Sequence, residues 1–218
     1  MVTGNTDKIA TASDERERER GSVDRLVFFT DAVIAIVITL MVLEVKPPHV
    51  RSEQELIPAL WALWHEYLAV GVSFLVIGIF WSRHHRLFQW VRRQDIGLVW
   101  INLLFLMSVS AIPFVTAVLA QHPQQVGTIL YAVTLALASL LMALLWTYAG
   151  SRAPIAPELP ATERRINIFA ALATAAVFLA SVPIAVWHAH AAKFFWLAVL
   201  AISVARRFLV SRPTAQSL

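Results

Sequence analysis

The stretch from Arg25 to Glu44, RLVFFTDAVIAIVITLMVLE, limits the possible folds of this chain more than any other feature. It is apolar except for its charged ends and a Thr30-Asp31 pair. A helix of about 20 such residues is long enough to cross the roughly 30 Å hydrocarbon core of a bilayer. An aspartate inside such a helix is costly to place in hydrocarbon, so Asp31 indicates either a function or a specific partner.

The composition places the whole chain in the same class. Of its 218 residues, 58% are hydrophobic and 15% are charged, and the mean hydropathy is +0.66, which is more apolar surface than a soluble domain buries. The pI of about 10.0 is compatible with nucleic-acid binding, but the basic residues stand at the ends of apolar runs and so indicate membrane topology. Cysteine is absent, which excludes disulfides and thiolate metal sites. We therefore predict an all-α, polytopic membrane protein.

Six apolar runs are candidates for transmembrane helices. We predict spans at Leu26–Val45, Ala59–Ser82, Ile96–Ala120, Val126–Ala149, Ile166–Trp187 and Phe194–Val210. Pro47 and Pro48 end the first span, and Pro113 is expected to kink the third. The sixth run is short because Arg206 and Arg207 interrupt it, although such arginines can extend to the membrane interface.

The distribution of basic residues gives the expected orientation. With six spans, both termini lie on one side of the membrane, and fifteen of the eighteen lysines and arginines fall in the tails and loops on that side. This excess predicts cytoplasmic termini. We divide the chain into a polar N-terminal tail or short helical lead-in (1–24), one six-helix transmembrane domain (25–211) and a short C-terminal tail (212–218).

Several polar residues are expected at one depth, near the cytoplasmic end of the bundle. Asp31 lies early in the first span, the second helix ends at His84 and His85, and Asn102 lies about one turn into the third. Such groups must bind one another or water in a bilayer. Polar contacts that only hold helices together are the common case. A proton relay or gating latch that uses the histidines stays open. A metal site is disfavoured because adjacent histidines point about 100° apart on a helix.

The first span also carries an apolar stripe. At about 100° per residue, Ile36, Leu40 and Leu43 fall on one line with Thr39 on its shoulder, while Asp31 projects roughly 140° away from Ile36. The residues alone favour a lipid-facing or packing surface over a pore, because leucine and isoleucine at helical spacing are common.

The motif Arg25-x-x-x-Phe29-Thr30-Asp31-x-x-x-Ala35 resembles the R-x-x-x-F-S-D-x-x-x-A signature of the transmembrane protein 175 family of potassium channels. Further matches are Trp81-x-x-His84-His85-x-x-Phe88, Asn102-Leu103 and Pro113-Phe114. The resemblance covers about residues 25 to 115. Thr30 departs from the family's usual serine, but it keeps the hydroxyl group and adds only a methyl.

The resemblance implies a homotetramer of six-span subunits in the bacterial plasma membrane, with the first helix of each subunit around a central pore for potassium ions. No cofactor and no nucleic-acid partner is expected. By analogy with the family, Ile36 forms a hydrophobic constriction, Leu40 and Leu43 line the pore further out, and a Thr39 hydroxyl ring bears on selectivity together with Ile36. The residues expected in a structural polar network behind the pore wall are Arg25, Thr30, Asp31, His84, His85 and Asn102.

Two other classes of function stay open. Asp31 with His84 and His85 is compatible with a proton-coupled secondary transporter, although the chain has no convincing repeat and no matched pair of broken helices that would indicate a midplane substrate site. A membrane enzyme is disfavoured because G-x-S-x-G, H-E-x-x-H and C-x-x-C-H motifs are absent. We expect no enzymatic activity.

Overall fold

The computed structural model describes residues 3–152, 154–188, 191–193 and 196, and the regular structure in these ranges is helical. The long helices are α1 (Thr3–Leu43), α3 (Trp64–Phe88), α6 (Gln125–Ser151) and α7 (Ala161–Trp187), and the shorter ones are α2 (Glu53–Ala62), α4 (Ile96–Ser110) and α5 (Ile112–Gln121). Within the described ranges, five stretches are long and apolar enough to cross a membrane: Glu17–Leu43, Glu66–Phe88, Ile96–Gln121, Gln125–Ser151 and Ala161–Trp187. The prediction of an all-helical, multi-pass membrane protein is thus confirmed. The predicted sixth span, Phe194–Val210, lies outside the described residues apart from Trp196.

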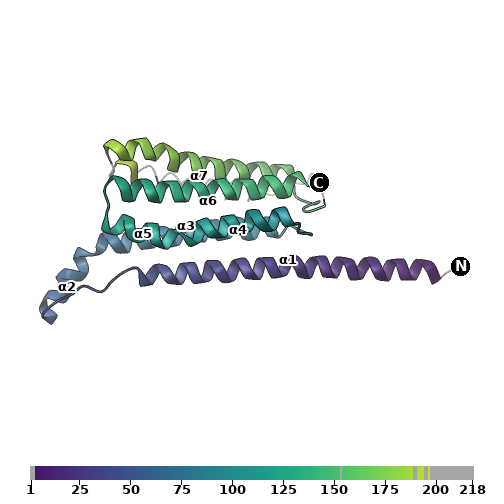
Figure 1. The fold of residues 1–218 in the computed structure, drawn as a ribbon, viewed down its shortest axis with the longest axis horizontal. Coiled ribbons are helices and arrows are strands. Elements are labelled where there is room, and N and C mark those ends of the chain that lie inside the picture. The colour runs from purple at the N-terminus through teal and green to yellow at the C-terminus, as the bar shows by residue number, and fades with distance from the viewer. Residues whose placement is uncertain (1–2, 153, 189–190, 194–195, 197–218) are drawn as a thin grey trace, which may run out of the picture.

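The pore-candidate helix α1 lies along one side of the bundle (Figure 1). It packs against α3, α4 and α5, while α6 and α7 pair on the opposite side. The N-terminal part of α1 projects past the ends of the other labelled helices, and α2 extends away from the bundle at the other end. The described helices of the subunit therefore cover α1 on one face.

The third span is broken near its middle, as the sequence predicts. α4 ends at Ser110, Ala111 separates the two helices, and α5 begins at Ile112. Pro113 causes the break, because it has no N–H to donate to the carbonyl of Val109 and its ring crowds that carbonyl. The predicted kink is confirmed, and α4 and α5 together form one candidate span.

The predicted boundaries of the second span are wrong at both ends. Instead of a loop that reaches Pro58, the chain forms α2 from Glu53, and α3 begins only at Trp64. α3 then continues past Ser82 to Phe88. Neither Gly nor Pro interrupts this segment, and the apolar side chains of Leu87 and Phe88 are buried against the bundle. His84 and His85 therefore lie in the last turns of α3, and the helix continues past them to Phe88.

The polar N-terminal segment continues the first span as helix. α1 begins at Thr3, so residues 3–24 and the apolar stretch after them form one element of 41 residues. Opposite charges three residues apart, as in Glu15 and Arg18 or Glu17 and Arg20, favour a helix of this composition.

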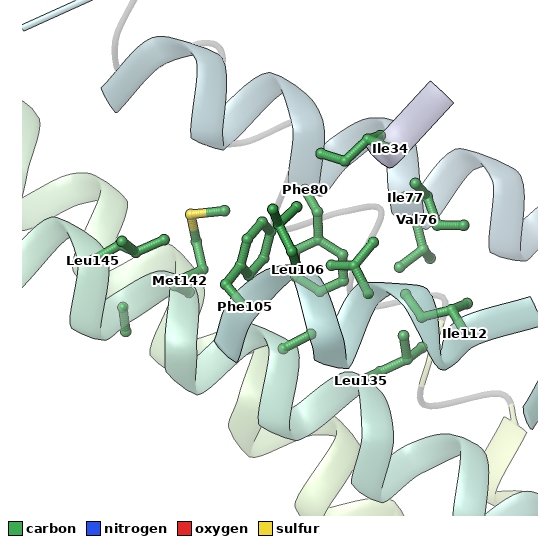
Figure 2. Close-up of a cluster of buried hydrophobic side chains, with 14 of the residues drawn as sticks. Ile34, Val76, Ile77, Phe80, Phe105, Leu106, Ile112, Leu135, Met142 and Leu145 are labelled. Carbon is green, nitrogen blue, oxygen red and sulfur yellow. The ribbon is translucent and has the colours of Figure 1, made fainter. Parts of the chain in front are cut away.

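The centre of the bundle is a layer of buried apolar side chains (Figure 2). Ile34 of α1, Ile77 and Phe80 of α3, Phe105 of α4 and Met142 of α6 belong to this one cluster. The rings of Phe80 and Phe105 meet edge to face with centroids 6.0 Å apart, a contact worth about 0.5–1.5 kcal/mol. This layer fixes the distance between α1 and the rest of the subunit.

Small side chains let α6 and α7 approach closely. In a membrane, where lipid tails are as apolar as leucine, helices associate through close packing and polar contacts, and small residues favour both. Buried alanines on this pair include Ala132, Ala136, Ala143, Ala149, Ala170, Ala171 and Ala175. The pair therefore forms a tightly packed support on the far side of α3 and α4 from α1.

Replacing Gly127 with a larger residue tests the close approach of α5 and α6. A Cβ at this position would lie 2.1 Å from the backbone oxygen of His122, so Gly127→Ala must push two backbones apart. We expect a loss of about 1–3 kcal/mol of stability. Gly71→Ala is the matched control, because a Cβ there meets nothing within 4 Å. Thermal unfolding of the purified variants in detergent measures both, and equal midpoints would contradict the close approach.

Candidate functional site

Three buried polar side chains join α1, α3 and α4. Nδ2 of Asn102 donates a hydrogen bond to Oγ1 of Thr30 at 2.9 Å, and Oδ1 of Asn102 lies 2.8 Å from Nε2 of His84. All three residues are fully buried. Because an amide oxygen can only accept, Nε2 of His84 carries the proton and donates it. We call Thr30, His84 and Asn102 the buried polar layer.

Aromatic rings fix the orientation of His84 within this layer. Its imidazole is stacked between Phe88, with ring centroids 4.3 Å apart, and Phe105, with centroids 5.9 Å apart. Phe88 lies on the same helix and Phe105 on α4, so rotating the ring disturbs two helices. The hydrogen bond to Asn102 therefore has a fixed direction.

Asp31 belongs to a second, separate contact. Nε1 of Trp81 donates to Oδ1 of Asp31 at 2.8 Å, and the Trp81 ring stacks on His85 with centroids 5.4 Å apart. Trp81 and His85 are exposed in the subunit and Asp31 is half-buried. The single polar network expected from the sequence is thus two groups. Adjacent residues on a helix point about 100° apart, so Thr30 and Asp31 on α1, like His84 and His85 on α3, face different surroundings.

Arg25 joins neither group. Its Nε donates to the backbone oxygen of Gly21 at 3.1 Å, and the side chain is exposed. Six residues separate Arg25 from Asp31, which places it about 120° away around α1. Trp81 is the partner of Asp31 that sequence reasoning missed, because a tryptophan near a helix end is also typical of the membrane interface. Its position three residues before His84 was the available signal.

The two faces of α1 differ sharply. The face that packs on the subunit is lined by Val23, Leu26, Thr30, Ile34, Val37 and Met41, all of them buried. On the other side Ile36 is 58% exposed, Leu40 44% and Leu43 74%. Oγ1 of Thr39 donates to the backbone oxygen of Ile36 at 2.8 Å, so this exposed hydroxyl needs no acceptor from another helix. We call Ile36, Thr39, Leu40 and Leu43 the exposed stripe.

The loop between α3 and α4 ties the polar end of α1 to the bundle. Nε of Arg93 lies 3.2 Å from Oε1 of Glu19, and Nε2 of Gln94 donates a hydrogen bond to Oγ of Ser22. Asp95 begins α4 by accepting from the backbone N–H of Leu98 at 2.8 Å. These contacts hold the N-terminal half of α1, on the N-terminal side of the buried polar layer.

The carboxyl group of Asp95 also reaches α6. It accepts a hydrogen bond from the hydroxyl group of Tyr148 at 2.8 Å and lies 3.6 Å from Arg152. Desolvation raises the pKa of Asp95, but the hydrogen bonds from Leu98 and Tyr148 and the charge of Arg152 outweigh it and hold this pKa below its usual range. Asp95 therefore stays ionised at neutral pH and keeps α4 joined to α6.

Metal binding finds no support in this arrangement. Among the described residues, no group of three or more His, Asp or Glu side chains is placed to hold a metal ion. His84 and His85 point into different surroundings, one toward Asn102 and the other toward Trp81.

Comparison with known proteins points to one family. Residues 25–113 match the family model described as endosomal/lysosomal potassium channel TMEM175. A Streptomyces collinus protein named as a potassium channel is 41% identical over 127 residues, which are 56% of this chain and 62% of that relative. A Chamaesiphon minutus protein with the same kind of name is 38% identical over 139 residues, which are 61% of this chain and 68% of that relative.

The fold is similar to that of a solved protein. The crystal structure of a lysosomal potassium-selective channel TMEM175 homolog from Chamaesiphon minutus superposes with a TM-score of 0.74 and 27% sequence identity. The similarity covers 86% of this chain and 99% of that chain. It therefore extends beyond the region matched by the family model.

Replacing Asn102 tests how much the buried polar layer contributes to the stability of the protein. Asn102→Leu leaves His84 and Thr30 buried without their partner, so we expect a loss of about 1–3 kcal/mol of stability. Trp81→Phe is the comparison, because it removes the N–H that Asp31 accepts at a site open to the surface, where we expect less than about 1 kcal/mol. Unfolding of both variants in detergent gives the two values. A larger loss for Trp81→Phe would reverse the assigned importance of the two contacts.

Proposed function

Since this chain belongs to the TMEM175 family, a family of ion channels and not of enzymes, we propose that it is a potassium-permeable cation channel of a bacterial plasma membrane. The bacterial relatives named as potassium channels support the choice of ion. The proposal includes six spans per subunit and cytoplasmic termini, which the excess of basic residues on one side favours.

The exposed stripe of α1 is the observation that carries the proposed pore. One helix face cannot enclose a pore, so the proposal requires several copies of α1, and we propose a homotetramer with the four stripes around a central axis. The stripe is largely apolar, yet its side chains are exposed and no described residue of the subunit covers them. A surface that packs on copies of itself accounts for this exposure, and the buried opposite face holds it in place.

Ile36 is the proposed constriction. Four isoleucine side chains that meet at the axis exclude water when they are close together and admit hydrated ions when the helices tilt or rotate apart, which is gating by dewetting. Thr39 places a hydroxyl ring about one turn outward, and Leu40 and Leu43 continue the apolar wall. No charged residue lies within the stripe, so we expect a moderate preference for potassium over sodium.

The buried polar layer acts as the anchor of the pore wall. Turning α1 by one residue position, about 100°, would pull Thr30 away from Asn102 and move Ile36 off the axis. Asp31 adds a second restraint on the flank through Trp81. Both contacts are positioning devices and neither touches the proposed ion path.

The transporter hypothesis receives less support. A proton-coupled mechanism based on Asp31 and the histidines is simplest if these groups share a hydrogen-bonded path. Here Asp31 bonds to Trp81, whereas His84 bonds to Asn102. Unitary current steps distinguish a channel from a transporter, whose flux is slow and saturable.

Ile36 is the residue whose replacement tests the proposal. In liposomes that contain the purified protein, potassium flux should exceed sodium flux under matched gradients. Ile36→Ala should widen the constriction, raise unitary conductance by roughly a factor of two or more, and lower the potassium preference. Ile36→Asn should wet the gate and raise the open fraction.

Leu137→Ala supplies the control, because Leu137 is an exposed apolar residue on α6, away from α1. It should conduct like the unaltered protein. Absence of any ion flux from the unaltered protein would exclude the channel, and unaltered unitary currents in both Ile36 variants would remove Ile36 from the constriction.

A further inference from the structure

The polar extension of α1 carries unpaired arginines on the same line as the exposed stripe. Arg18 precedes Ile36 by 18 residues, which is five full turns at 3.6 residues per turn, so the two side chains leave the helix in the same direction. Arg25 precedes Ile36 by 11 residues, about three turns, and deviates by only about 20°. Both arginines are exposed.

These two arginines differ from four other arginines at this end of the bundle. Arg86, Arg92, Arg93 and Arg152 each lie within 4.0 Å of a carboxylate oxygen. Neither Arg18 nor Arg25 forms an ion pair with any described residue, and the Nε of Arg25 bonds only to a backbone oxygen of its own helix. No carboxylate in the described part of the chain is therefore paired with either charge.

The nearby acidic residues point in other directions. Glu19 turns toward the α3–α4 loop and pairs with Arg93. Counted around the helix from Ile36, Glu15 lies about 60° and Glu17 about 100° off the line. Between residues 15 and 25, the line that continues the exposed stripe therefore carries net positive charge.

We propose that Arg18 and Arg25 form two rings of positive charge around the N-terminal mouth of the pore and make the channel rectify. The inference rests on the proposed tetramer, which brings four copies of each arginine to face one axis. Positive rings lower the local potassium concentration at that mouth. Potassium current that starts from the N-terminal side is then smaller than current that starts from the opposite side.

The distance from each arginine ring to Ile36 determines where along the pore the positive charge acts. At 1.5 Å per residue, Arg18 lies about 27 Å and Arg25 about 16 Å from Ile36 along the helix. The Debye length is about 8 Å at physiological ionic strength and about 3 Å at 1 M salt. The rings therefore do not alter the barrier at Ile36. They change the supply of ions at one mouth, and this effect disappears in concentrated salt.

The test records single-channel currents in patches that expose the N-terminal side to the bath, at equal voltages of opposite sign and in symmetric potassium chloride. The unaltered channel should pass less current away from the N-terminal side than toward it at about 0.15 M salt, and equal currents at about 1 M. Arg18→Gln should move the current ratio at least halfway to unity, Arg18→Glu further, and Arg18→Lys should leave it unchanged.

Arg20→Gln is the matched control. Arg20 is exposed, carries the same charge and forms no ion pair with a described residue, but it lies about 160° away from the line through Ile36. Its removal should leave the ratio unchanged. A conducting channel whose ratio is unaffected by Arg18→Gln, or equally affected by Arg20→Gln, overturns the inference and leaves the proposed function intact. An unaltered protein that conducts no ions overturns the proposed function, and the inference with it.

Discussion

A polar side chain in the hydrocarbon region must find a polar partner, and in this protein that requirement fixes how α1 is turned. The hydroxyl group of Thr30 accepts a hydrogen bond from the amide group of Asn102 on α4, and Asn102 in turn binds His84 of α3. Because the three are fully buried, breaking either bond leaves an unsatisfied group in a medium without water. The rotation of α1, and therefore the identity of the residues on its uncovered face, follows from these two hydrogen bonds.

The rest of the subunit supports this arrangement. The aromatic contacts of His84 with Phe88 and Phe105 set the direction of the second bond. On the far side, α6 and α7 pack through small side chains and give α3 and α4 a firm backing. On the N-terminal side of the buried polar layer, the α3–α4 loop binds Glu19 and Ser22 of α1. The contacts of α1 are thus spread along one face, and the stripe on the other face stays uncovered.

Much of this could be predicted from the sequence, since span positions depend on hydropathy and the kink depends on Pro113. The C-terminal end of the second span was mispredicted because Leu87 and Phe88 extend α3 through tertiary packing, which no local pattern reports. The depth of the polar residues was predictable from topology, and Thr30, Asn102 and His84 do meet. That Asp31, Trp81 and His85 form a separate group was not predictable, because the grouping depends on which residues of neighbouring helices face each side of α1 and α3. Arg25 was misplaced for the same reason.

The central claim is that the exposed face of α1 lines the ion path, and the absence of cysteine from the chain allows a direct test. A single cysteine at Thr39 should react with a positively charged, membrane-impermeant methanethiosulfonate, and the attached charge should block potassium current. A cysteine at Leu137 on α6 should leave the current unchanged under the same treatment. If the cysteine at Thr39 is fully modified, as shown by mass spectrometry of the recovered protein, and the current persists, α1 does not line the pore.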